Sequence, residues 1–148
     1  MSRRCIAGFT LMELLTVLAV IGIIAVIALP MYRDHALRGH LARATEGLAD
    51  MRGRMEKHYQ NRRTYATDGG VVSPCAVAAA QRTFGVFVVD CQTLGAEAFL
   101  LRATGSGAAA GFILTLDQRD GRATTGVPAG SGWTTCTTRW MRRKGDTC

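Results

Sequence analysis

The chain of 148 residues lacks the motifs that most enzymes require. It has few serines and no Gly-x-Ser-x-Gly turn. It also has no pairing of a histidine with a cysteine that would stay a free thiol once the expected disulfides form. The glycines of residues 105–111 do not have the spacing of a dinucleotide loop. The three histidines, His35, His40 and His58, fall mostly on polar faces of a predicted helix, where we expect water to solvate them. The sequence therefore predicts no enzyme and no cofactor.

Charge is almost absent from residues 8–30, a long apolar run in which Glu13 is the one ionisable residue. As a helix, residues 9–29 would span roughly 30 Å, the thickness of bilayer hydrocarbon. A secretory signal peptide has a shorter apolar stretch, about 7–15 residues, and is cut after it. Here a short basic segment, residues 1–8, precedes the run. We therefore expect the run to stay attached to the remainder of the chain.

The basic leader followed by Gly8, Phe9 and Glu13 resembles the N-terminal signature of type IV prepilins. Pro30 and residues 59–66 extend the resemblance to minor pilins, so that it covers about the first 65 residues well. The resemblance implies the α+β pilin fold, in which one long N-terminal helix packs on a small antiparallel β-sheet. It also implies a minor pilin-like subunit of a bacterial type IV pilus.

The same resemblance implies how the protein is processed and assembled. A prepilin peptidase would cut between Gly8 and Phe9 and methylate the new amine of Phe9. Glu13, whose carboxylate is costly within a spanning helix, would pair with the Phe9 amine of a neighbouring subunit. The implied partners are this peptidase, the inner-membrane assembly platform, membrane lipid before assembly, and other pilin subunits. The protein would wait in the inner membrane, single-pass with a periplasmic head, and then join the extracellular pilus for adhesion, twitching motility or DNA uptake.

Apolar residues beyond Pro30 recur at steps of three and four, which predicts one stripe along a helix. The helix should run from Phe9 to about Arg62, with a bend near Pro30 because proline removes a backbone hydrogen bond. Arg63 stands where related pilins usually have glycine. The residues of the stripe are Leu37, Leu41, Ala44, Leu48, Met51, Met55 and Tyr59.

Segments rich in β-formers come next, at residues 84–91, 98–104 and 111–116. They predict an antiparallel sheet of three or four short strands against the amphipathic half of the helix. Residues 126–148 should form an irregular loop, with one strand near residues 133–139. The predicted division is a leader (1–8), a transmembrane or filament-core helix (9–30), the amphipathic half of the helix (31–66), and a sheet-containing head with the C-terminal loop (67–148).

Cysteines are few, and Cys5 lies in the leader. The remaining four suggest two disulfides in an exported head, with three possible pairings. We favour Cys75–Cys91 and Cys136–Cys148, because each closes a short loop, which the chain-entropy model values at about 3 kcal/mol. Zinc is the alternative, but no Cys-x-x-Cys spacing exists and the histidines lie elsewhere. No metal site is therefore expected.

Basic residues and a tryptophan alternate near the C-terminus, in a chain with a net charge of +7. Arginines neutralise phosphates and an exposed tryptophan can stack on an unpaired base. The segment is thus a candidate DNA contact, as in a DNA-receptor minor pilin of natural transformation. Alternatively, it is a solvated, disulfide-closed loop whose tryptophan covers the sheet. The residues concerned are Arg139, Trp140, Arg142, Arg143 and Lys144.

Two further alternatives share the apolar run. A type II secretion pseudopilin has the same N-terminal signature, although the paired cysteines of the head favour a pilus. A secreted soluble protein would lose the run by cleavage after Ala28. The first residue of the mature chain, Phe9 or Leu29, distinguishes the two kinds of processing.

Overall fold

The structure is a computed structural model that describes residues 9–148; the leader (1–8), which ends at Gly8, lies outside the described residues. The chain divides into two compact units, the second of which is Leu37–Cys148 and forms the head. A single helix, α1 (Leu11–Arg62), contributes residues to both units. It continues through Pro30, and the bend expected there stays a prediction.

Helix α1 begins at Leu11, two residues after the predicted start at Phe9, and Thr10 caps it. The Thr10 Oγ1 accepts a hydrogen bond from the backbone N–H of Glu13 at 3.2 Å. Thr10 and Glu13 also have the spacing of a capping box, in which an acidic residue occupies the first turn. Glu13 therefore lies where a negative charge is favourable to the helix dipole.

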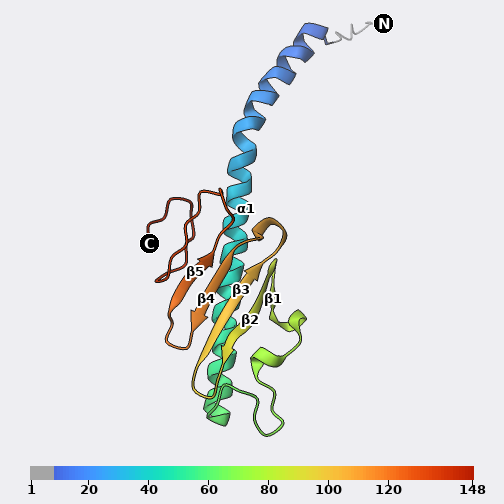
Figure 1. The fold of residues 1–148 in the computed structure, drawn as a ribbon. Coiled ribbons are helices and arrows are strands. Elements are labelled where there is room, and N and C mark those ends of the chain that lie inside the picture. Colours follow the sequence, from blue (N-terminus) through green and yellow to red (C-terminus); the bar gives the residue numbers. More distant parts are fainter. Residues whose placement is uncertain (1–8) are drawn as a thin grey trace, which may run out of the picture. The chain divides into compact units, whose positions relative to one another are not determined.

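The head contains a five-stranded antiparallel sheet in which each strand pairs with the next one along the chain (Figure 1). Two of its strands were not predicted, the short β1 and the largely polar β5. The strand expected near residues 133–139 is instead a single bridge between Cys136 and Thr124. The strands are β1 (Thr83–Phe84), β2 (Phe87–Leu94), β3 (Phe99–Gly105), β4 (Ile113–Asp117) and β5 (Arg122–Gly126).

The core of the head lies between the sheet and the second half of α1, which passes across one face of the sheet (Figure 1). Alternate residues of β2 and β3 point into this core, so their burial follows the period of two that a strand imposes. The predicted stripe of α1 is confirmed, although Leu37 and Tyr59 at its two ends are only partly buried. Its fully buried members are Leu41, Ala44, Leu48, Met51 and Met55.

The end of α1 has the backbone geometry of a glycine-terminated helix. Arg63 has a φ of 59°, in the left-handed region, and its N–H donates to the Tyr59 carbonyl at 2.7 Å. This hydrogen bond closes the last turn of the helix. In most helices that end with a residue in the left-handed region, that residue is glycine. Arg63 therefore adopts a backbone conformation that glycine, which has no Cβ atom, adopts without steric cost.

The prediction that all three histidines are solvated is wrong for His58. His58 is only 8% exposed, and its Nε2 lies 2.9 Å from the carbonyl oxygen of Ala66. Since a carbonyl can only accept, Nε2 carries the proton and donates it. The chain after α1 folds back over this part of the helix, which periodicity within the helix could not reveal.

Candidate functional site

The N-terminal part of α1 presents an apolar surface on all sides. Its large side chains are exposed from Phe9, at 81%, to Tyr32, at 71%, and none packs into a core. Among the described residues, α1 is the one helix whose length and composition suit a membrane span. A helix that is apolar all round needs lipid or other helices around it.

Glu13 interrupts this apolar surface with one carboxylate. Within residues 9–148, no ion pair involves its side chain, and its hydrogen bonds with the side chains of Thr10 and Thr16 use its backbone N–H and C=O. Phe9 lies four positions earlier, just before the helix begins. A carboxylate within an apolar helix surface needs a compensating positive group, which the described part of the chain does not offer.

The four cysteines of the head form two disulfides. One joins Cys75 to Cys91, with Cα atoms 5.7 Å apart, and the other joins Cys136 to Cys148, with Cα atoms 5.2 Å apart. The first ties the segment after α1 to β2. The second closes the C-terminal segment into a loop, and both pairings are those favoured from the sequence.

Ser73 helps to fix the first disulfide. It is fully buried, and its hydroxyl donates to the Tyr65 carbonyl at 2.7 Å. The Sδ of buried Met55 lies 3.6 Å from the Cys75 sulfur. The disulfide is therefore packed against α1, and it contributes to the core as well as to the cross-link.

Trp140 is held against the sheet by two contacts. Its indole N–H donates to the Thr115 carbonyl at 2.8 Å, and the Arg122 guanidinium lies 4.9 Å from the centre of its ring. The next residue, Met141, is buried, and its N–H donates to Thr124 Oγ1 at 2.9 Å. Trp140 thus covers the β4–β5 end of the sheet, and one face of its ring already carries a cation.

Arginines gather beside Trp140 around a hollow of about 260 Å³. Its lining includes Arg122, Arg139 and Arg142 together with Asp146. The Asp146 carboxylate accepts hydrogen bonds from the backbone N–H groups of Arg142 and Arg143, both at 3.0 Å. These hydrogen bonds, the one from Arg142 first, lower the pKa of Asp146, and the nearby charges of Arg139 and Arg143 act in the same direction.

Arg122 is the member of this surface that the sequence did not single out. It pairs with Asp120 at 2.8 Å, and Asp120 also pairs with Arg52 of α1 at 2.6 Å. Because β5 was not predicted, nothing in the sequence placed Arg122 beside Trp140. Lys144, which the sequence did single out, is exposed in the same C-terminal segment.

Within the part of the chain that the structure describes, no group of three His, Cys, Asp or Glu side chains could hold a metal ion.

Two comparisons define the class of protein. The fold is similar to that of the non-core minor pilin PilV of Neisseria meningitidis, with a TM-score of 0.54 and 18% identity over 66% of this chain and 94% of that one. The model of the prokaryotic N-terminal methylation motif matches residues 3–29. A long N-terminal helix whose first part carries the methylation motif, packed on an antiparallel sheet, is the pilin architecture. The prediction of this fold from the sequence is thereby confirmed.

The family follows from a longer match. The model described as type IV minor pilin ComP, DNA uptake sequence receptor, matches residues 30–112, more than half of the chain. The chain belongs to this family and is a type IV minor pilin, a structural subunit. Fimbrial protein EcpC of Eikenella corrodens is 30% identical over 98 residues, which make up 66% of this chain and 64% of that protein. The chain thus spans less than two thirds of the length of this curated relative.

Proposed function

We propose that residues 9–30 anchor the protein in the inner membrane, with the head on the periplasmic side, until it is assembled into an extracellular pilus. The observation that carries this proposal is the apolar surface of α1, which is exposed on all sides over its first half. In the bilayer and in a bundle of pilin helices this surface meets a similarly apolar environment. Nothing in the chain predicts a nucleotide site, so a separate assembly platform must supply the work of extraction.

Processing between Gly8 and Phe9 precedes this assembly. The methylation motif matched over residues 3–29 supports cleavage there and methylation of the Phe9 amine by a prepilin peptidase. Cleavage would remove residues 1–8 and leave the filament-core half of the helix (9–30), its amphipathic half (31–66) and the sheet-containing part (67–148). A bulky residue in place of Gly8 should leave the precursor uncut on an immunoblot, and normal processing would argue against this cleavage site.

In the filament, the Phe9 amine of a neighbouring subunit pairs with Glu13. Support comes from the Glu13 carboxylate, which has no ion-pair partner among the described residues although it lies in an apolar run. Such a pair neutralises two charges in a low-dielectric core and fixes the axial step between helices. Immunoblots that compare sheared pili with membranes test this proposal. The pairing can form only in a filament, so the wild-type subunit must be found in the pili, and its absence from them would contradict the proposal.

A second proposed function is DNA binding by the head. It is favoured by membership of a family described as containing a DNA uptake sequence receptor, and by the arginines around the hollow next to Trp140. The family match ends at residue 112, so residues 139–144 enter this proposal through their charge alone. Arg139, Arg142, Arg143 and Lys144 would contact phosphates, while Trp140 would position Arg122.

A mobility shift with duplex DNA at two salt concentrations tests this second function. Phosphate contacts by several arginines predict an affinity that falls steeply with salt. The slope of the logarithm of the binding constant against the logarithm of the salt concentration should be about −0.9 for each phosphate neutralised. Arg139→Gln with Arg142→Gln should reduce both the affinity and the salt slope. Absence of binding at low salt would exclude DNA uptake by this surface.

A further inference from the structure

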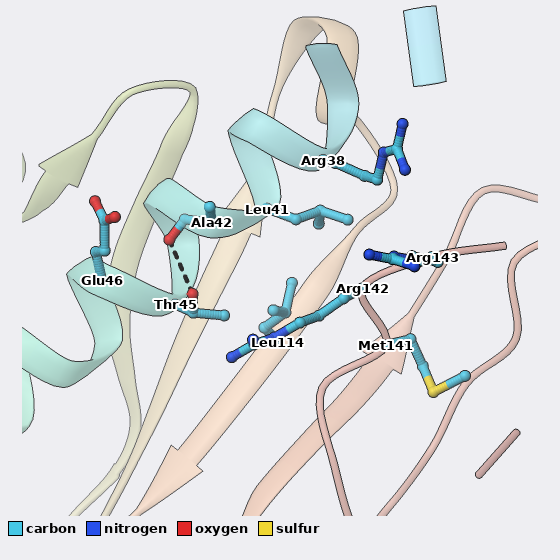
Figure 2. A pocket seen from close by; sticks show the side chains of 9 residues that line it. All are labelled: Arg38, Leu41, Ala42, Thr45, Glu46, Leu114, Met141, Arg142 and Arg143. Atoms are coloured by element: carbon cyan, nitrogen blue, oxygen red, sulfur yellow. Dashed lines mark hydrogen bonds between the residues drawn. The ribbon is translucent and has the colours of Figure 1, made fainter. Parts of the chain in front are cut away.

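The head contains a second, larger cavity, of about 380 Å³, between α1 and the C-terminal segment (Figure 2). It is distinct from the hollow beside Trp140, although Arg142 borders both. Its volume lies within the range of sites that hold small molecules or headgroups.

Positive charge dominates the rim of this cavity. Arg38 comes from α1, and Arg142 and Arg143 come from the C-terminal segment. Figure 2 shows Arg143 extending toward the side of the cavity where Arg38 leaves the helix, whereas Arg142 extends toward Thr45. Each guanidinium group can bind phosphate oxygens with paired, charge-assisted hydrogen bonds.

Two carboxylates oppose this charge without cancelling it. Glu46 lines the cavity, and three arginines with one glutamate leave a net charge of two positive units in the lining. Asp146 lies outside the lining and accepts hydrogen bonds from the backbone N–H groups of Arg142 and Arg143. The cavity therefore suits an anion.

The inner wall of the cavity is apolar. Leu41 is 3% exposed, and Leu114 and Met141 are 1% exposed, so the wall is continuous with the hydrophobic core of the head. A phosphate that also carries an apolar chain, as in a phospholipid, matches this combination of a cationic rim and an apolar wall. A DNA duplex matches it less well, because its phosphates lie on a convex surface and have no apolar group to place against the wall.

Arg38 lies close in sequence to the apolar run. Tyr32 follows the apolar run directly, and tyrosines are typical of the headgroup region. Arg38 lies six residues further along α1, a rise of about 9 Å, which a long arginine side chain can partly bridge. On the proposed membrane-anchored stage, on which this inference rests, Arg38 therefore belongs to the part of α1 that directly follows the membrane segment.

We propose that this cavity binds the phosphate of an anionic phospholipid headgroup while the subunit is anchored in the bilayer. The bound lipid ties the C-terminal segment and α1 to the membrane surface on the periplasmic side. Because the headgroup stays in the bilayer, extraction of the subunit into the pilus has to release it. The cavity is then a contact specific to the unassembled state.

The test uses the full chain in nanodiscs of equal parts phosphatidylglycerol and phosphatidylcholine, released into a native mass spectrometer. We expect the wild-type protein to retain phosphatidylglycerol in preference to phosphatidylcholine. Arg38→Gln with Arg143→Gln should weaken this retention by about tenfold, the loss expected for a few charge-assisted hydrogen bonds. Lys57→Gln with Arg119→Gln removes the same charge from exposed residues outside the cavity and should leave retention unchanged.

Equal effects of the two double variants would reduce the retention to overall charge and overturn the proposal. Unchanged lipid retention with lost DNA binding in the Arg38 and Arg143 variant would also overturn it, since the cavity would then be a DNA phosphate site. Arg38→Lys with Arg143→Lys keeps the charge and should restore part of the retention if the variant is correctly folded. A protein that enters nanodiscs but shows no lipid preference contradicts this inference alone, whereas failure to enter nanodiscs contradicts the membrane anchoring as well.

Discussion

The ring of Phe84 fills the space beside Gly47 of α1, so that a Cβ atom built on Gly47 would collide with that ring. Phe84 belongs to β1, the short edge strand, and pairs with Phe87 of β2. The glycine therefore lets the edge of the sheet approach the helix closely. Its helix-weakening effect is offset by this contact, whereas Gly53, with open space around its Cα, has no such compensation.

Replacing Gly47 should destabilise the head even though alanine is the better helix former. Gly47→Ala should lower the free energy of unfolding by about 1–3 kcal/mol through overpacking against Phe84. Gly53→Ala is the matched control and should raise it by up to about 1 kcal/mol. Denaturant unfolding of the full chain in detergent measures both, and equal stabilisation by the two substitutions would show that Phe84 moves aside without cost.

Alkaline pH should destabilise the head through Tyr65. Burial, followed by the hydrogen bond from its hydroxyl to Glu56 at 3.1 Å, raises the pKa of Tyr65 to about 12. A raised pKa favours the protonated phenol in the folded state. The stabilisation is thus complete below pH 10 and is lost as the pH rises toward about 12.

The size of this effect is up to about 3 kcal/mol for a shift of this order. Tyr65→Phe should remove that part of the pH dependence, while Tyr32→Phe, at an exposed residue, should not. The measurement is the free energy of unfolding between pH 8 and pH 12, taken as a difference between variants. An identical alkaline slope in wild type and Tyr65→Phe would contradict the assignment.

The indole of Trp140 should contribute to stability through its N–H group. Trp140→Phe keeps an aromatic ring near Arg122 but leaves the Thr115 carbonyl without this donor. We expect a loss of about 1–2 kcal/mol in the free energy of unfolding. DNA affinity, if measured on the same variant, should change little, because phosphate contacts by the arginines do not use the indole.

Unchanged stability of Trp140→Phe together with a large loss of DNA affinity would instead favour base stacking by the tryptophan. Arg119→Gln, which alters an exposed arginine outside the hollow beside Trp140, is the control for a general effect of charge on DNA binding.

The sequence predicted those parts of the fold that carry a local period. The stripe from Leu41 to Met55 was predicted because helical spacing alone puts these residues on one face. The strand β5 was missed because Thr124 is its one fully buried residue, and its pairing depends on β4 and on the bridge to Cys136. The two residues of β1 are too few for any period.

The candidate sites show the same division. Glu13 and the Gly8–Phe9 step stand out within the sequence because each interrupts or begins an apolar run. Arg38 and Arg143, by contrast, lie more than one hundred residues apart in the sequence, and they line one cavity only because the C-terminal segment returns to α1. Such tertiary placement leaves no signal in one sequence.

Removing the charge of Glu13 should reduce incorporation into pili without affecting insertion or cleavage. Glu13→Gln keeps the size and polarity of the side chain but cannot pair with a positive Phe9 amine. Thr16→Ala, one turn away, is the control and should assemble normally. The amounts of each variant in sheared pili and in membranes provide the measurement, and wild-type incorporation of Glu13→Gln would remove the argument for a charge pair.

The mass of the mature chain isolated from sheared pili tests most directly whether the apolar half of α1 is retained. We predict a polypeptide that begins at Phe9, carries one additional methyl group on its amine, and contains the two disulfides of the head. A polypeptide that begins at Leu29, or one absent from pili and found only free in the medium, would contradict the account.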